Sequence, residues 1–478
     1  PQRGVFCTRE LDLRGIKGIG YDMDYTLIDY KMVLLEERVY HYSKEFLRAK
    51  GFPVSGLRFT HELVVRGLIV DTLHGHVIKV DRFGYVRRAM HGTRRLSPEE
   101  INAAYENMPP IDLRDERWVF MNTLFSVSEG CLYAQLVDRL DSGQLYTDAS
   151  EPFDAERCAT YEQLYKAVSK ALFKAHVQSK MKEEIMQEPL RFVNTDPAYT
   201  STLLEQRAAG KKLFLLTNSG LPFVDRGMTF LAGEGWRSLF DAVVVSAQKP
   251  SFYQGQAPFR AFDANERFVK WSPAGLETLE KGRVLLGGSV SELARLTGWT
   301  GPSVLYIGDH LFSDLLEPRS RLGWTTGAII RELEQELAVM SSPEYVALDA
   351  RARVLDGELR EAADTWSASS PRPEGLSELL DALESDLRET RVERQKLFNA
   401  HFGSVFRMSG GDSTAFAFNV RQHVDVYTSR VENLLSVADG HRFYPQRRGL
   451  LPHESRAAAA ARGVPESWES HAQSRVDT

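Results

Sequence analysis

Two aspartates near the N-terminus have the spacing of a catalytic carboxylate pair. Asp22 and Asp24 stand two residues apart, directly after the apolar run at 16–21. If the chain turns between them, both carboxylates can face one pocket. One can then attack a phosphate ester, while the other passes a proton to the leaving oxygen and later activates water. An aspartate after a strand more often caps a helix or forms a turn, so the pair alone leaves both uses open.

A second acidic pair, Asp309 and Asp314, follows the apolar run at 304–307. Mg²⁺ prefers hard oxygen ligands, takes few of them from protein, and keeps several waters. Asp309 could complete such a site with Asp22, while Asp314 orients a metal-bound water. Asp314 by itself could equally cap the helix that follows.

Polar and basic residues follow two further apolar runs. Thr217, Asn218 and Ser219 come directly after 212–216, where hydroxyl and amide groups can cradle phosphate oxygens or simply cap a helix. Lys249 comes shortly after 242–245 and could neutralise the charge that develops in phosphoryl transfer. A lone lysine is ordinarily a solvated surface residue, so the order of all four segments is the stronger signal.

The apolar runs that precede these groups have the length and composition of strands buried on both faces. Helical segments at 201–209 and 292–297 lie between them, and a further strand is expected at 325–330. This alternation predicts a doubly wound α/β fold with a mostly parallel sheet. Because the carboxyl ends of parallel strands share one edge, the polar residues should converge there.

Residues 22–211 separate the first two runs, far more than one crossover connection needs, which predicts an inserted cap. The cap should hold a β-like stretch at 67–86 and helices at 98–107 and 161–187. Beyond about residue 370 we expect a long charged helix at 377–402 and another at 415–435. The predicted division is a catalytic core at 1–35 and 200–345, a cap at 36–199, a C-terminal helical region at 346–455 and a flexible tail at 456–478.

Composition excludes several classes of protein. The formal net charge is −6, which favours neither nucleic acid nor an anionic membrane as a partner. No run approaches the length of a membrane span, and the N-terminus is too charged for a signal peptide. Three scattered cysteines, Cys7, Cys131 and Cys158, fit a reducing compartment, so we expect a cytoplasmic protein.

The ordered set DxDxT, Thr-Asn-Ser, lone lysine and GDxxxxD resembles that of the haloacid dehalogenase (HAD) superfamily. Within it, the sequence resembles the cytosolic purine 5′-nucleotidases over most of its length. The segments that carry this resemblance are GYDMDYTLIDYK (20–31), RGLIVDTLHGHVIKVDRFG (66–84), NTLFS (122–126), LFLLTNSGLPFVD (213–225), QKPSFY (248–253), LGGS (286–289), VLYIGDHLFSDLL (304–316) and LLPHES (450–455).

The resemblance implies roles for matching positions. It makes Asp22 the nucleophile and Asp24 the general acid and base. It implies a Mg²⁺ cofactor bound by Asp22, the Asp24 backbone carbonyl and Asp309, with Asp314 in support. It also implies phosphate contacts from Thr217, Asn218 and Lys249.

The base-binding positions match the family only in part. Phe125 and His176 fall where the family stacks rings on the purine, although core packing is an equal alternative for Phe125. Where the family reads the base edge with an arginine and an aspartate, this chain has Ser169 and Phe173.

The expected activity is hydrolysis of nucleoside 5′-monophosphates, preferably IMP and GMP, through an aspartyl-phosphate that could also be passed to another nucleoside. The family's homo-oligomers imply a dimer or tetramer. Two alternatives stay open: a phosphatase of another small phosphomonoester, and a nucleotide-binding regulator that has lost turnover.

One further motif, His74-x-His76, has the spacing of two metal ligands on one face of a strand. We expect no third ligand nearby, so surface or hairpin histidines are the favoured interpretation.

Overall fold

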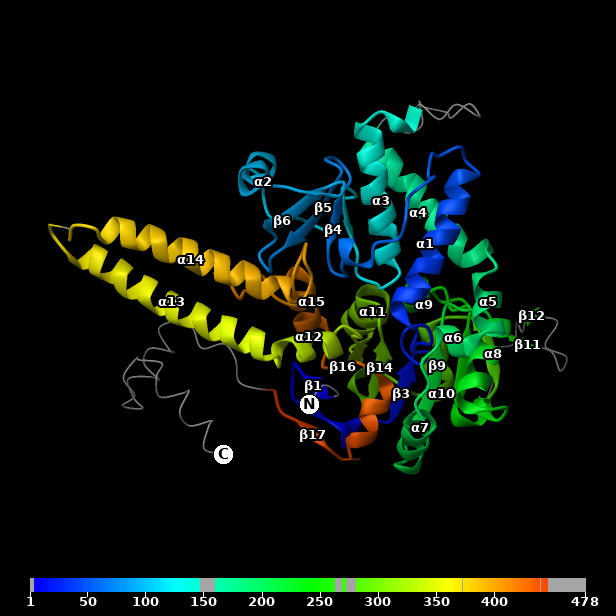
Figure 1. Cartoon of the computed structure of the whole chain (residues 1–478). Coiled ribbons are helices and arrows are strands. Elements are labelled where there is room, and N and C mark those ends of the chain that lie inside the picture. The colour runs from blue at the N-terminus through cyan, green and yellow to red at the C-terminus, as the bar shows by residue number, and fades with distance from the viewer. Residues whose placement is uncertain are drawn as a thin grey trace.

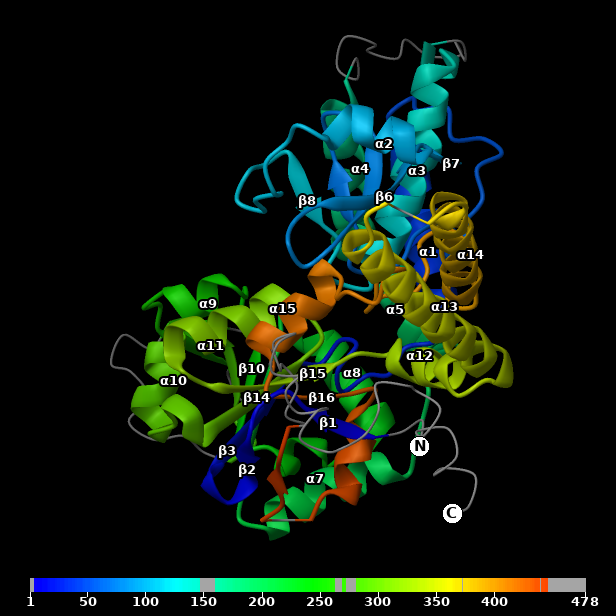
Figure 2. The same ribbon diagram turned by 90° about the vertical axis from the view of Figure 1, so that its left-hand side faces the viewer.

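The computed structural model describes residues 4–146, 160–262, 269–271, 281–371, 373–438 and 440–445. A large sheet with flanking helices forms the core, a second α/β unit lies over it, and a helical hairpin projects to one side (Figures 1 and 2). The expected LLPHES motif and the tail at 456–478 lie outside the described residues.

The core sheet has ten strands in the order β1-β16-β15-β14-β3-β9-β10-β13-β11-β12. All pairings from β16 through β13 are parallel, and the outer pairings are antiparallel. The parallel strands are β3 (Gly18–Tyr21), β9 (Lys212–Leu216), β10 (Ala242–Val245), β13 (Val284–Gly287), β14 (Val304–Gly308), β15 (Thr325–Ile329) and β16 (Val426–Thr428). The antiparallel ones are β1 (Val5–Cys7), β11 (Phe259–Phe262) and β12 (Val269–Trp271). The four apolar runs and the expected strand at 325–330 are therefore confirmed as strands.

Both faces of this sheet are covered. Along β9, Leu213 and Leu215 join one buried cluster, whereas Phe214 and Leu216 join another, as the two-residue period of a strand requires. The first cluster includes residues of α7 (Ala198–Ala208) and α8 (Leu221–Ala232). The second includes residues of α9 (Ser251–Gln254) and α10 (Val290–Thr297). The doubly wound α/β fold is thus confirmed.

The cap is inserted between β3 and β9. It contains a five-stranded antiparallel sheet in the order β7-β6-β5-β4-β8, with helices packed against it. Its strands are β4 (Ile69–Asp71), β5 (His76–Val80), β6 (Val86–His91), β7 (Arg94–Arg95) and β8 (Trp118–Phe120). Its helices are α1 (Met32–Arg48), α2 (Pro98–Tyr105), α3 (Ser126–Asp141), α4 (Tyr161–Gln178), α5 (Met181–Gln187) and α6 (Pro189–Phe192).

The projecting hairpin consists of α13 (Pro343–Ala368) and α14 (Leu376–Lys396), which pack along each other through a narrow leucine and alanine seam (Figure 1). It is joined to the core through α12 (Leu333–Met340), and α11 (Glu317–Leu322) precedes β15. The predicted charged helix is confirmed as α14. Among the described helices, none has both the length and the apolar surface needed to cross a bilayer.

The single helix expected at 415–435 is wrong. Helix α15 (Ala415–His423) is short, and the chain continues into strand β16, which lies between β15 and β1 in the core sheet. The segment Val424-Asp-Val-Tyr-Thr428 is rich in β-branched residues, which favour a strand once a neighbouring edge is available. A two-stranded ribbon of β2 (Leu11–Asp12) and β17 (Arg442–Phe443) lies beyond it. Part of the predicted C-terminal helical region therefore belongs to the core sheet.

Candidate active site

Three carboxylates meet at the carboxyl edge of the core sheet. Strands β3 and β14 are neighbours, and the Asp22 backbone amide donates to the Ile307 carbonyl at 2.9 Å. Asp22 and Asp309 follow these strands directly, and Asp314 lies in the π-helical turn η7 (Leu311–Leu316). One oxygen from each carboxylate lies within 4.8 Å of the other two. Gly308 permits this approach, because a Cβ there would lie 2.4 Å from the Asp314 Cβ.

Lys249 lies between two of these carboxylates. Its Nζ is 2.8 Å from Asp22 Oδ1 and 2.6 Å from Asp314 Oδ1, and it also donates to the Tyr306 hydroxyl at 3.1 Å. All four charged groups are buried. One ammonium therefore faces three carboxylates, which leaves negative charge uncompensated in a region of low dielectric.

The pKa values reflect this excess of negative charge. Burial raises the pKa of Asp22 to about 7, and Asp314 and Asp24 add to the rise while Lys249 opposes it. Burial also raises the pKa of Asp309 well above its usual value, with Asp314 and Asp22 adding to the effect. A divalent cation would remove the repulsion that keeps these groups protonated.

The donor set fits a magnesium ion. Asp22, Asp309 and Asp314 offer hard oxygen atoms, and buried Oδ2 of Asp309 has no hydrogen-bond partner within the described part of the chain. A buried carboxylate oxygen without a donor is unfavourable, and a metal ion would satisfy it. These residues could hold Mg²⁺ with the remaining positions left to water and substrate oxygens.

Asp24 is held through both of its oxygens. The Tyr30 hydroxyl donates to Oδ1 at 2.6 Å, and the Ser219 hydroxyl donates to Oδ2 at 2.6 Å. Lys182, at the start of the cap helix α5, donates to the Ser219 hydroxyl at 3.1 Å. The carboxylate next to the expected nucleophile is therefore oriented by the nucleophile loop, the core and the cap together.

Thr217 and Asn218 occupy the turn after β9. The Asn218 side chain accepts from the Lys249 backbone amide at 2.6 Å and donates to the Lys249 carbonyl at 3.2 Å, so it positions Lys249. The Thr217 hydroxyl accepts from the Ser219 amide at 3.1 Å, which leaves its proton available. The three residues of the predicted cradle thus lie at the sheet edge, with Asn218 engaged in bracing the neighbouring turn.

The structure brings the rings of Phe125 and His176 together. Their centroids are 4.5 Å apart at an interplanar angle of 77°, and Tyr25 contacts the other side of Phe125 at 4.6 Å. Burial, with Lys182 nearby, lowers the pKa of His176 to about 4, so its imidazole is neutral. The pair contacts edge to face, so a base would have to displace one ring or stack on an outer face.

Three contributors were not expected from the sequence. Tyr30 and Lys182 reach Asp24 and Ser219 as described above. Arg66, with a fully buried side chain, pairs with Glu332 at 2.6 Å and donates to the Asp309 carbonyl at 3.4 Å. None of these residues follows an apolar run, so the strand-end signal could not find them. Tyr30 and Arg66 do lie in the segments 20–31 and 66–84 that carry the family resemblance, whereas Lys182 lies in none of the segments named for it.

The expectation that His74 and His76 have no third ligand nearby is wrong, because Asp71 and His91 lie beside them. However, Arg117 Nη2 is 2.7 Å from Asp71 Oδ2 and 3.0 Å from His74 Nδ1. The guanidinium occupies the position in which a metal ion would contact both groups. This cluster is therefore a hydrogen-bonded polar network at the β4–β5 hairpin of the cap, with His76 buried rather than at the surface.

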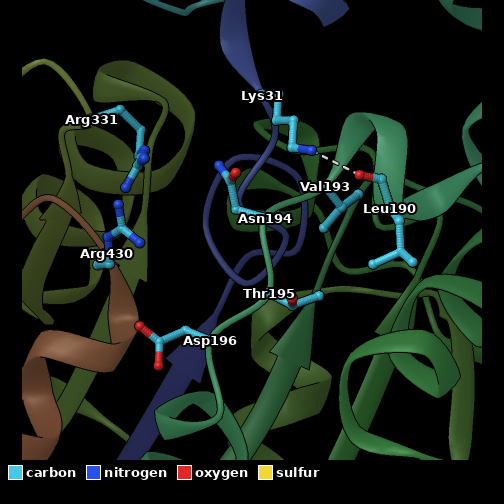
Figure 3. A pocket seen from close by; sticks show the side chains of 8 residues that line it. All are labelled: Lys31, Leu190, Val193, Asn194, Thr195, Asp196, Arg331 and Arg430. Atoms are coloured by element: carbon cyan, nitrogen blue, oxygen red, sulfur yellow. Dashed lines mark hydrogen bonds between the residues drawn. The ribbon is translucent and has the colours of Figure 1, made fainter.

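A separate cavity of about 530 Å³ has none of these carboxylates in its lining (Figure 3). Its basic side chains already have partners: Arg331 pairs with Asp29 at 3.0 Å, Arg430 pairs with Glu334 at 2.8 Å, and Lys31 donates to the Leu190 carbonyl. It therefore lacks the uncompensated positive charge that would favour a phosphate. The residues that line it are Lys31, Leu190, Val193, Asn194, Thr195, Asp196, Arg331 and Arg430.

Known proteins resemble this chain along nearly its whole length. The model of the 5′ nucleotidase family matches residues 5–456. A 5′-nucleotidase domain-containing protein of Dictyostelium discoideum is 31% identical over 94% of this chain and 74% of its own length. The human 5′-nucleotidase domain-containing protein 2 is 32% identical over 94% of this chain and 85% of its own.

The comparison with solved structures gives weaker evidence than the related sequences do. The crystal structure of a HAD phosphatase from Thermococcus onnurineus covers 66% of this chain and 87% of its own at 14% identity. Its TM-score of 0.24 is too low to carry an argument. The family match and the relatives identify a hydrolase of the 5′-nucleotidase type, and the chain belongs to the 5′ nucleotidase family.

Proposed function

We propose that this protein hydrolyses nucleoside 5′-monophosphates, preferably purine ones, in a Mg²⁺-dependent reaction through an aspartyl-phosphate on Asp22. One observation carries the proposal: the carboxylates of Asp22, Asp309 and Asp314 converge within 4.8 Å beside the Lys249 ammonium. Uncompensated negative charge calls for a divalent cation, and the cation with Lys249 makes a site for a phosphoryl group. Membership of the 5′ nucleotidase family supports the nucleotide as substrate.

In the first step, a carboxylate oxygen of Asp22 attacks phosphorus. The Asp22–phosphorus bond forms while the bond to the nucleoside O5′ breaks, and O5′ takes the proton carried by Asp24. In the second step, water attacks phosphorus and gives a proton to Asp24, and the Asp22–phosphorus bond breaks to release phosphate. A second nucleoside in place of water would receive the phosphoryl group by the same route.

The neighbouring residues have positioning and electrostatic roles. Tyr30 and Ser219 hold the two Asp24 oxygens, so the proton is exchanged from a fixed position. Lys249 stabilises negative charge on the phosphoryl oxygens, and the Thr217 hydroxyl can donate to them. Bound Mg²⁺, held by Asp22, the Asp24 carbonyl and Asp309 with Asp314 in support, would neutralise charge and align the phosphoryl group.

For the base, we propose stacking against Phe125 and His176. Their contact at 4.5 Å places two flat rings next to each other, and the neutral imidazole suits stacking on a purine. Preference for IMP and GMP is part of this proposal.

The test is phosphate release from IMP, GMP, AMP, UMP and a deoxynucleotide, with Mg²⁺ and with EDTA. We expect turnover of purine monophosphates that EDTA abolishes and Mg²⁺ restores. Inactivity on every nucleotide together with hydrolysis of a sugar phosphate would favour a phosphatase of another small phosphomonoester. Nucleotide binding without release of phosphate from any substrate would favour a regulator.

We also propose a cytoplasmic homo-oligomer with the core, cap and C-terminal regions at the predicted boundaries, except that strand β16 is counted in the core. The free thiols of Cys7 and Cys131 support a reducing compartment. Light scattering of the purified chain tests the dimer or tetramer, and limited proteolysis tests the boundaries.

A further inference from the structure

Helices α3 and α4 of the cap pack as an antiparallel pair with matching faces. Phe125 meets His176 at one end, and Tyr133 meets Tyr165 further along, with ring centroids 5.4 Å apart. Glu129 lies midway between Phe125 and Tyr133, four residues from each and thus on the same face of α3. Its backbone lies about one helical turn, a rise of ~6 Å for four residues, beyond that of Phe125.

Glu129 is buried, with 7% of its surface exposed, and its Oε1 atom has no hydrogen-bond partner among the described residues. The hydroxyls of Ser169 and Tyr165 face the carboxyl, but burial outweighs them and raises the pKa of Glu129. A nearby carboxylate in the same cap shows the contrast. Glu36 is also buried, and each of its oxygens has a donor, from the Tyr25 hydroxyl at 2.7 Å and the Ser128 amide at 3.2 Å.

A buried carboxylate oxygen without a donor is unfavourable unless a ligand supplies one. We infer that Glu129 reads the edge of a base stacked at Phe125 and His176, and that it selects guanine over hypoxanthine and adenine. This inference rests on the proposed function. The inference makes Glu129, on α3, a specificity-determining residue. Ser169 faces Glu129 from α4, and the serine side chain is too short to reach the base edge itself.

The chemistry of the three purines gives the order of preference. Donors on a bound base favour the ionised form of Glu129 against the effect of burial, and an ionised carboxylate oxygen only accepts hydrogen bonds and has two lone pairs. Guanine presents a ring N–H beside an exocyclic amine, so both lone pairs can be used. At this N1–C2 edge hypoxanthine presents the ring N–H alone. Adenine presents a bare ring nitrogen and a C–H there, because its amine lies at the other side of the ring nitrogen, on C6. We expect a site with such an acceptor to reject the base that cannot donate to it.

Binding in this way requires the ring pair to open. A base between Phe125 and His176 needs the rings about 7 Å apart, twice the ~3.5 Å contact distance of carbon atoms, whereas the centroids now lie 4.5 Å apart. His176 follows Ser169 by two turns on α4, so a shift of this helix would move both residues relative to α3.

The experiment measures kcat/KM for GMP, IMP and AMP on the same preparations of wild type and Glu129→Gln. The ratio of two substrates cancels the fraction of active protein, so partial misfolding does not affect it. We expect the wild type to prefer GMP, and Glu129→Gln to lower the GMP/IMP ratio about 10-fold, mainly through KM. Glu129→Asp, which withdraws the carboxylate by one methylene, provides a second variant and should lower the ratio partially.

The matched control is Glu336→Gln, a buried carboxylate in α12 whose oxygens accept from Ser404 and Val405. It should leave the ratio unchanged. An equal GMP/IMP ratio in wild type and both Glu129 variants would overturn the inference while the proposed function stands. Absence of all nucleotide hydrolysis, with activity on another phosphomonoester, would overturn both.

Discussion

The Ser219 hydroxyl lies 2.6 Å from Asp24 Oδ2, although 195 residues separate the two in sequence. This hydrogen bond joins the turn after β9 to the loop after β3. Lys182, in the cap, donates to the same Ser219 hydroxyl. Because the Tyr30 hydroxyl holds the other oxygen, the Asp24 carboxylate has little freedom to rotate. A proton donor fixed in this way can serve both halves of a two-step phosphoryl transfer.

Ser219→Ala should lower kcat about 10-fold and change KM little, because it releases one oxygen of Asp24 without removing the carboxylate. Steady-state phosphate release from the preferred nucleotide measures both constants. Ser201→Ala, on the exposed surface of α7, is the control and should behave as wild type. A large rise in KM with unchanged kcat would instead indicate that Ser219 acts in substrate binding.

Asp22→Asn should reduce phosphate release by more than about 10³-fold, because the amide cannot form the aspartyl-phosphate. Its melting temperature should stay near that of wild type, since asparagine has almost the same shape. Acid-quenched samples of wild type should contain phosphorylated protein, whereas the variant should not. Turnover by Asp22→Asn equal to wild type would refute the assignment of the nucleophile.

Arg66→Met should lower the free energy of unfolding by about 3–5 kcal/mol, the effect of removing one member of a buried ion pair. The Arg66 side chain is 0% exposed and pairs with Glu332 at 2.6 Å, so the variant leaves a carboxylate in a nonpolar setting. Urea unfolding measures the change. Arg94→Met removes an arginine that is 60% exposed from a pair with Glu100, which is itself 43% exposed, and should cost less than about 1 kcal/mol.

Glu36 should make stability depend on pH. Burial raises its pKa to about 7, with Tyr25 and Ser128 opposing the rise, whereas an unfolded glutamate titrates near ~4.3. Between these values the folded state holds more protons than the unfolded state, so stability falls as pH rises, by as much as about 3 kcal/mol.

Melting temperatures of wild type and Glu36→Gln between pH 5 and 8 test this dependence. The variant should show a smaller decrease with rising pH, because its side chain does not titrate. Glu37→Gln, at an exposed neighbouring position, should keep the slope of wild type. Identical slopes for all three proteins would contradict the expectation.

The sequence alone indicated the core strands and the residues that follow them. Residues 213–216 and 304–307 are apolar throughout, which is typical of strands buried on both faces. Residues at the ends of parallel strands must share an edge, so Asp22, Asp309 and Lys249 could be expected together before any coordinates were known. Local composition and one rule of topology suffice for this inference.

The local sequence pattern did not predict the structure where a segment or side chain contacts a partner that is distant in the sequence. The segment 415–435 reads as helical, but β15 offers an edge on which Val426–Thr428 forms a strand. His74 and His76 have the spacing of metal ligands, yet Arg117 contacts His74 and Tyr105 contacts His76, both from other parts of the cap.

In the same way, the side chains that α4 places opposite Glu129 decide whether each of its carboxylate oxygens has a hydrogen-bond donor. The sequence therefore determined the core strands that carry the candidate site, because burial along a strand is a local property. Only the tertiary structure decided how each charge is compensated. The ion-pair and hydrogen-bond partners of these groups come from segments far apart in the chain, so their spacing in the sequence does not predict the contacts.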